Sequence, residues 1–183
     1  MHHNKDSLFS FGDISGDYIA GFVDGEGCFA LKFRRDIKTE RKNSPTYFYW
    51  NAEFAICLRK DDEEILRMIK NIFKCGGISI DKRGYVRYSV SDITNLVTRV
   101  IPFFDLYKLK AKKRFDFELW KEAVKILEKN KKKNVNVAKG MPGFQKTDWN
   151  QNDLERLLEI HNRIALYKGS VSRSKWINFK SNT

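Results

Sequence analysis

The 183-residue sequence has few cysteines and few histidines. Cys28, Cys57 and Cys75 are odd in number and widely spaced, which fits neither a zinc-binding pattern nor a disulfide framework. We therefore expect all three to act as small, buried hydrophobic residues. The three histidines are not grouped with residues that would form an acid–base centre. The composition therefore gives no indication of chemistry that uses a cysteine or histidine nucleophile.

Long apolar runs are also absent. No run approaches the roughly 18–20 residues that are needed to cross a bilayer, so we expect no membrane partner. The first residues, MHHNKDSLFSFGD, lack the apolar core of a secretory signal. We expect an intracellular location, which is either a bacterial cytoplasm or an organelle (chloroplast or mitochondrion); the sequence does not distinguish between them.

Positive charge is abundant. The chain has 35 Lys and Arg residues against 23 Asp and Glu residues, a formal net charge of +12. This excess indicates a partner that carries phosphate, although a basic solvated surface alone would give the same count. The sequence contains no convincing amphipathic helix or polybasic tail for an anionic membrane. A hydrophobic fraction of 42% and an aromatic fraction of 14% indicate a folded chain.

The order of the predicted elements defines the fold class. Apolar residues three and four apart predict helices, and strict alternation predicts strands. The helices expected are 15–24, 61–73, one from about 92 that precedes Pro102, 109–130 and 151–166; the strands expected are 28–35, 47–59 and a hairpin within 76–90. This order, αββαββα with extra C-terminal helices, predicts an α+β domain with one four-stranded antiparallel sheet.

One face of the predicted sheet is apolar and should carry the helices, whereas the other is polar and basic. Arg, Lys, Asn, Glu and Tyr are side chains that read base edges in a DNA groove, and a two-stranded β-ribbon fits the major groove. A plain solvated face is the alternative. The residues expected to contact DNA here are Lys32, Arg34, Tyr49, Asn51, Glu53, Arg83 at the hairpin turn, Arg87 and Ser89.

The first predicted helix combines small residues with two acids at its end. Ala20, Gly21 and Gly25 line one side, which would let a second helix pack closely. The run occurs once in the chain, so we expect the partner helix to come from a second copy across a two-fold axis. The carboxylates of Asp24 and Glu26 from both copies would then lie together, and hard oxygen ligands of this kind suit Mg²⁺.

The stretch YIAGFVDGEGCFAL, residues 18–31, resembles the defining motif of the LAGLIDADG homing endonucleases. The element order agrees with that family's fold, and the single motif is similar to that of the members that act as homodimers. The resemblance implies a saddle-like sheet and one endonuclease domain over 1–183. Its core would be about 13–125, and the C-terminal helices and basic loop would be 126–183. The dimer contacts expected on the motif helix are Ile19, Ala20, Gly21, Val23 and Asp24.

The resemblance also implies roles for the acids of the motif. The last acid, Glu26, corresponds to the family's metal-binding carboxylate, and the backbone carbonyl of Gly25 would contribute too. Asp24 is expected to cap or brace the end of the helix rather than to bind metal. The implied cofactor is Mg²⁺, with Mn²⁺ or Ca²⁺ as plausible substitutes in the site.

Basic residues near the scissile phosphate follow from the same resemblance. The stretch DLYKLKAKK, residues 105–113, is similar to the family's basic segment after the second hairpin, and Lys110 is the best match for the catalytic lysine. Its neighbours are Lys108 and Lys112. Residues 167–176 resemble the C-terminal loop that contacts the DNA backbone. The candidates there are Lys168, Arg173 and Lys175.

One position departs from the family pattern. A polar residue that positions water would correspond to Leu58, which is apolar. Either water is ordered in a different way, or the correspondence shifts by one residue and Arg59 takes the role.

The function expected is site-specific cleavage of double-stranded DNA by metal-dependent phosphodiester hydrolysis. A homodimer would make a staggered double-strand break at a long, roughly palindromic target, as in intron homing. Two alternatives keep the same fold: an RNA-binding splicing maturase, and a DNA-binding protein without catalysis.

Overall fold

A computed structural model gives the arrangement of the chain. It describes residues 14–37, 39–40, 42, 46–130 and 150–167. The strands are β1 Gly27–Ile37, β2 Thr46–Arg59, β3 Gly77–Ile80 and β4 Tyr85–Val90. The helices are α1 Gly16–Glu26, α2 Glu63–Phe73, α3 Ile93–Asn95, α4 Ile101–Leu106, α5 Lys113–Asn130 and α6 Gln151–Tyr167, with a 3₁₀ turn at Lys60–Asp62 and a π-helix at Leu96–Val100. The predicted element order and α+β class are confirmed.

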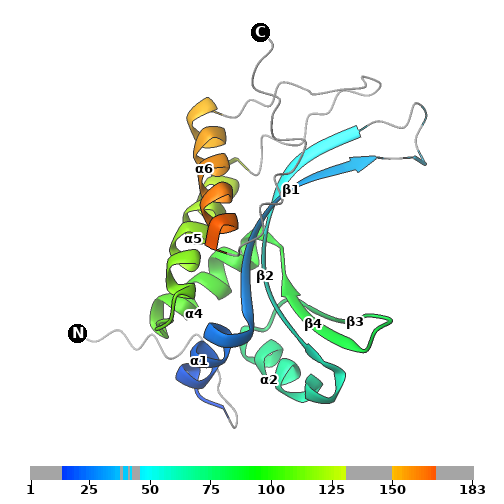
Figure 1. The fold of residues 1–183 in the computed structure, drawn as a ribbon, viewed down its shortest axis with the longest axis vertical. Coiled ribbons are helices and arrows are strands. Elements are labelled where there is room, and N and C mark those ends of the chain that lie inside the picture. The colour runs from blue at the N-terminus through cyan, green and yellow to red at the C-terminus, as the bar shows by residue number, and fades with distance from the viewer. Residues whose placement is uncertain (1–13, 38, 41, 43–45, 131–149, 168–183) are drawn as a thin grey trace.

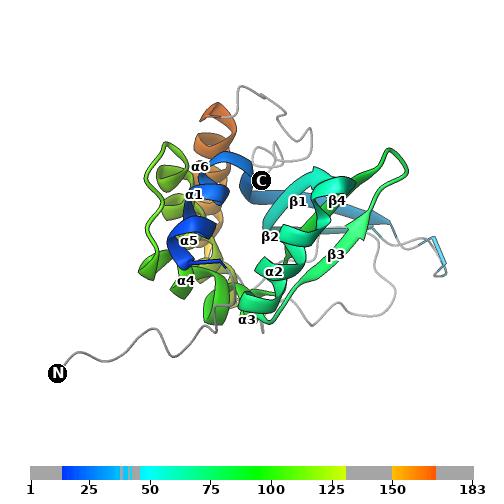
Figure 2. The same ribbon diagram turned by 90° about the horizontal axis from the view of Figure 1, so that it is seen from below.

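Four antiparallel strands form one sheet in the order β1-β2-β4-β3. β1 and β2 make a long hairpin in which Ala30 lies opposite Glu53 and Arg34 lies opposite Tyr49. β2 continues past the end of β1 and pairs with β4, so that Cys57 lies opposite Arg87. Figure 1 shows the sheet as a curved layer with α4, α5 and α6 on its convex side. In Figure 2, α2 lies beside β3 and β4.

The helices and the sheet enclose an aromatic core. The ring of Phe29 on β1 lies 5.4 Å from that of Phe54 on β2 and 5.1 Å from that of Trp120 on α5. Phe104 and Phe117 complete this group at 5.4 Å and 5.2 Å from Phe29. Burial of large rings in tilted and edge-on pairs holds the convex face of the sheet to the helices. The opposite face, which we call the concave face, carries the alternate residues of each strand.

Two helix boundaries differ by more than two residues from those predicted. The helical segment that starts after the cap residue Asp92 continues through Pro102, because this proline lies in the first turn of α4, where a missing N–H is tolerated. α5 begins at Lys113 rather than at 109, because the backbone before it forms a loop that hydrogen-bonds to α1.

The structure corrects three of the five expected dimer contacts on α1, those at Ile19, Ala20 and Val23. Ser15 caps this helix by accepting a hydrogen bond from the N–H of Tyr18. Ile19 and Val23 are fully buried and Ala20 is 2% exposed, because these residues pack into the chain's own core. They are therefore not available to a second copy. Gly21, which was also expected at the interface, is exposed, and Tyr18 and Gly25 lie on the same side of the helix.

The first residue of α1 is constrained by a tyrosine. A Cβ built at Gly16 would lie 2.5 Å from three ring atoms of Tyr107, which follows α4. A side chain at position 16 would therefore displace the ring and the loop that it begins.

Substitution of Gly16 tests this packing. We expect Gly16→Ala to lower the free energy of unfolding by about 1–3 kcal/mol, as overpacking of a close contact does. Gly77→Ala is the control, because a Cβ at Gly77 would meet no described atom within 4 Å. Chemical denaturation of both variants measures the difference. Equal stability of the two variants would contradict the assigned contact.

Candidate functional site

The concave face collects the polar residues of three strands. On β1 and β2, Arg34 lies opposite Tyr49 and Lys32 lies opposite Asn51, and opposite residues of an antiparallel pair share a face. Arg34 and Tyr49 are exposed, whereas Lys32 and Asn51 are partly buried. On β4, Arg87 and Ser89 lie opposite Cys57 and Ala55 of the same face of β2. The structure thus places all of the predicted strand residues on one face.

An acid lies among these basic residues. Glu53 on β2 is only 9% exposed and forms ion pairs with Lys32 of β1 and with Arg87 of β4, the latter at 2.9 Å. Burial alone would raise the pKa of Glu53, but the hydrogen bonds from Lys32 and Arg87 outweigh it and hold the pKa below its usual value. Glu53 is therefore ionised at neutral pH and linked to two cations.

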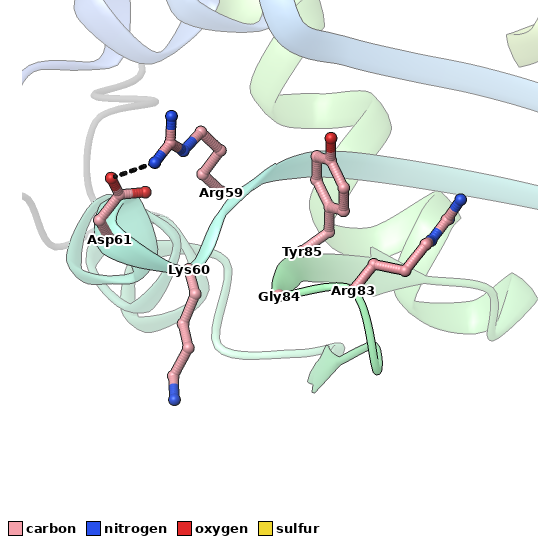
Figure 3. Close-up of a pocket in the computed structure, with 6 residues that line it drawn as sticks. All are labelled: Arg59, Lys60, Asp61, Arg83, Gly84 and Tyr85. Atoms are coloured by element: carbon pink, nitrogen blue, oxygen red, sulfur yellow. Dashed lines mark ion pairs between the residues drawn. The ribbon is translucent and has the colours of Figure 1, made fainter.

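A shallow hollow of about 480 Å³ lies where β2 ends and the β3–β4 hairpin turns. Figure 3 shows the side chains of Arg59, Arg83 and Tyr85 on one side of the ribbon and that of Lys60 on the other. Gly84 has a φ of +82°, which a glycine adopts readily, and its carbonyl accepts a hydrogen bond from the N–H of Lys60. The hollow therefore adds basic and aromatic side chains to the end of the concave face.

The residues around position 58 separate into two faces. Leu58 packs against the core on the helix side of the sheet, so it is not a polar group of the concave face. Arg59 faces the hollow and pairs with Asp61 at 3.3 Å. Arg59, and not Leu58, therefore lies on the candidate DNA side of the sheet. Cys57 is exposed on the concave face, contrary to the expectation that all cysteines are buried.

Asp24 braces the end of α1. Its Oδ2 atom accepts hydrogen bonds from the backbone N–H groups of Lys110 at 2.6 Å and of Ala111 at 3.1 Å. The loop between α4 and α5 is therefore fixed to the motif helix by a charged acceptor, a stronger kind of hydrogen bond than one between neutral groups. This geometry agrees with the bracing role that was expected for Asp24.

Lys113, which sequence reasoning missed, reaches the acidic end of α1. Its Nζ atom donates to the carbonyl oxygens of Val23 at 2.9 Å and of Gly25 at 3.1 Å. Burial lowers the pKa of Lys113, and the acidic groups around it, which include Asp24 and Glu26, offset that effect only in part. Lys110, the predicted lysine, contributes its backbone N–H to Asp24 and has an exposed side chain. Lys113 is the last residue of the predicted basic segment 105–113, but the place where the loop ends and α5 begins, which brings Lys113 to α1, could not be predicted from that segment alone.

The donors at this end of α1 are hard oxygens. Glu26 is exposed at the last position of the helix, and the carbonyl of Gly25 precedes it. A carbonyl oxygen has two lone pairs, so the contact with Lys113 leaves room for a cation. Among the described residues, no group of three or more His, Cys, Asp and Glu side chains lies close enough to hold a metal ion. The oxygens fit a hard divalent cation only if DNA, water or a second copy completes the ligand set.

The remaining predicted residues are placed as follows. Arg83 lies in the β3–β4 turn, where its guanidinium is 3.2 Å from Asp81 and 5.7 Å from the centroid of the Tyr85 ring. Lys168, Arg173 and Lys175 lie outside the described residues. Over the part of the chain that the structure covers, no helix is both long and apolar enough to span a membrane.

Known proteins resemble this chain in sequence and in fold. A "Probable intron-encoded endonuclease 2" of Neurospora crassa is 36% identical over 122 residues, which cover 64% of this chain and 25% of that protein. The homing endonuclease I-TnaI has a TM-score of 0.63 and 23% identity over 86% of this chain and 98% of that one. I-SmaMI, solved bound to an uncleaved DNA target in the presence of calcium ions, has a TM-score of 0.63 and 19% identity over 86% and 50% of the two chains.

The chain spans about a quarter of the length of the Neurospora relative that it matches. The likeness to I-TnaI and I-SmaMI shows the fold. The profile of the LAGLIDADG endonuclease family matches residues 19–124, from within α1 to within α5, and therefore includes both the braced acidic end of the motif helix and the whole sheet. The chain belongs to the LAGLIDADG endonuclease family.

Proposed function

We propose that this chain is a site-specific DNA endonuclease that hydrolyses phosphodiester bonds, as in intron homing. The observation that carries the proposal is the direct connection of two features. The acidic end of α1, with Glu26 and the amino group of Lys113, continues without a break into β1 of the basic concave face. The surface that we propose binds duplex DNA therefore begins next to Glu26 and Lys113, the side chains suited to chemistry on a phosphate. The intron-encoded Neurospora relative supports this proposal and a place of action inside the cell.

Mg²⁺ is the proposed cofactor, with Mn²⁺ or Ca²⁺ as substitutes. Glu26 and the carbonyl oxygen of Gly25 would hold the cation, and the chemistry of these oxygens fits a hard ion. When bound, such an ion lowers the pKa of water and stabilises charge on the phosphate in the transition state. The structure of I-SmaMI on an uncleaved DNA target was solved in the presence of calcium ions, which supports a divalent cation here.

The chain's own residues bind and orient the substrate. The ammonium group of Lys113 is held at the end of α1 by two carbonyls, where it would stabilise negative charge that develops on a neighbouring phosphate. Asp24 fixes the loop that leads into α5, so that Lys113 is positioned before DNA arrives. Arg34 and Tyr49 on the concave face would contact base edges in the major groove.

A second copy of the chain would complete the site. The exposed side of α1 has no side chain at Gly21 and Gly25, and a Cβ at either would meet no described atom within 4 Å. Tyr18 is 51% exposed and stacks on Phe22 at 6.2 Å between ring centroids, which provides apolar surface beside the glycines. We propose that two motif helices pack here about a two-fold axis and bring the two Glu26 residues together. Such a homodimer has a formal charge of 2 × 12 = +24 on this sequence.

The deciding experiment is cleavage of a randomised duplex library in Mg²⁺ by wild type and by Glu26→Gln. We expect wild type to produce staggered breaks at one recurrent, roughly palindromic site. Glu26→Gln should bind that site with unchanged affinity and cut it at least about 10²-fold more slowly, because it loses a hard anionic oxygen at the cation. Selection of one duplex without cleavage by either protein would indicate a DNA-binding protein. Selection of no duplex would redirect the test to intron RNA and a maturase.

Two lysines can be compared in the same assay. We expect Lys113→Met to lower the cleavage rate by about 10²-fold or more, as removal of one electrostatic stabiliser does. Lys110→Met is the matched control, since its side chain is exposed and its backbone contact with Asp24 is kept. Its rate should fall by less than about tenfold. Target binding in Ca²⁺ checks that both variants remain folded. A larger effect at Lys110 than at Lys113 would return the catalytic role to Lys110.

The proposed dimer can be tested on the exposed face of α1. Gly21→Arg places a long charged side chain in open space, so the chain should keep its fold. We expect this variant to be monomeric in sedimentation experiments and to lose double-strand cleavage. Lys70→Ala on the exposed surface of α2 is the control, and its sedimentation should still give the mass of a dimer. A dimeric Gly21→Arg variant would rule out this helix face as the interface.

A further inference from the structure

We propose that Glu53 determines specificity: it fixes Lys32 and Arg87 for contact with base edges and keeps both cations away from the DNA backbone. This inference rests on the proposed DNA-binding function of the concave face. The observation is the ion-pair cluster that joins three neighbouring strands, with Glu53 on β2, Lys32 on β1 and Arg87 on β4.

The strand register explains how three residues from different positions meet. Lys32 lies opposite Asn51 and reaches Glu53 diagonally, one alternate position along β2. Arg87 lies opposite Cys57, and the pair formed by Ala55 and Ser89 lies between it and Glu53. Because Ala55 and Ser89 have small side chains, the long arginine can extend along the sheet over them and place its Nη2 atom 2.9 Å from Glu53.

Burial makes the acid a fixed part of this face. Only 12% of the Glu53 side chain is exposed, against 37% for Lys32 and 38% for Arg87. The acid is therefore buried more deeply than the two cations, each of which keeps more than a third of its side chain exposed. The lowered pKa of Glu53 agrees with a permanent negative charge at this position. A protein that only had to attract phosphate would lose affinity by burying an acid here.

What the acid provides is orientation. Lysine and arginine side chains have many rotamers, and a free cation on a DNA-binding face contacts phosphates whatever the sequence. Pairing with Glu53 removes most of this rotamer freedom and partly neutralises both cations. The N–H groups of Lys32 and Arg87 that do not bind Glu53 are therefore held in fixed orientations. Base recognition needs donors in fixed positions, whereas backbone binding needs only charge.

Equilibrium binding to two duplexes in Ca²⁺ tests the proposal. One is the target selected by wild type, and the other is a scrambled duplex of equal length. We expect Glu53→Gln, which keeps the shape of the side chain and loses the charge, to bind the scrambled duplex more tightly than wild type. The ratio of target to scrambled affinity should fall at least about tenfold. The slope of log K against log[salt] should become more negative by about 0.9 for each new phosphate contact.

Asp61→Asn is the matched control. It removes the same charge and frees one cation, Arg59, but leaves the cluster around Glu53 intact. It should therefore tighten binding to both duplexes and keep their ratio within about threefold of wild type. Glu53→Asp retains the carboxylate on a shorter side chain, and its ratio should lie between those of wild type and Glu53→Gln. Thermal unfolding of each variant checks that the fold is kept.

The outcomes separate the inference from the function on which it rests. If Glu53→Gln weakens target binding without any gain on the scrambled duplex, Glu53 contacts a base itself and the proposal is wrong. An unchanged ratio, or the same ratio change in Asp61→Asn, would also overturn it. Failure of wild type to select or cut any duplex would instead contradict the proposed function, whatever the variants do.

Discussion

The candidate site depends on a reciprocal attachment between α1 and the segment before α5. Asp24 of the helix accepts two backbone hydrogen bonds from the segment, and Lys113, just after it, donates two hydrogen bonds back to helix carbonyls. The contacts join residues 86 to 90 positions apart, so neither end is fixed by local structure. The carbonyl oxygen of Val23 already accepts the N–H of the cap residue Gly27, so Lys113 adds a second donor there, and a cation is a favourable partner for carbonyls at the C-terminal end of a helix. The acid–lysine group is therefore a product of tertiary structure.

The charges of the concave face act in two opposite ways: the basic residues attract DNA of any sequence, whereas the acid among them limits this attraction and fixes side-chain orientation. Positive charge attracts any duplex, and nonspecific binding of this kind competes with recognition of one site on the proposed DNA-binding face. The buried carboxylate of Glu53 opposes that general attraction at the centre of the face, while the outer positions, such as Arg34, remain exposed. The surface thus combines a tightly paired inner region with a freely accessible outer one.

Much of this arrangement was predictable from local patterns. Alternation in 28–35 and 47–59 predicted the strands and the side chains on each face, because the period of a strand is independent of its partners. The motif helix was predictable from the spacing of its apolar residues, which is likewise a local property. The burial of Ile19 and Val23 was not, since an apolar helix face looks the same whether it packs on its own core or on a second chain. The role of Lys113 depended on where a loop ends, and that end is set by the distant Asp24.

The register between Arg87 and Glu53 has a consequence for how such a protein can acquire a new target. Exposed residues such as Arg34 and Tyr49, which lie opposite each other away from Glu53, can be exchanged without disturbing the ion pairs of Glu53. The inner residues are coupled through one carboxylate and through the small side chains of Ala55 and Ser89 that leave space for the arginine. A change at any of them disturbs the others. Recognition at the outer part of a half-site would thus drift gradually among relatives, whereas the inner part would change in blocks of several residues or stay the same.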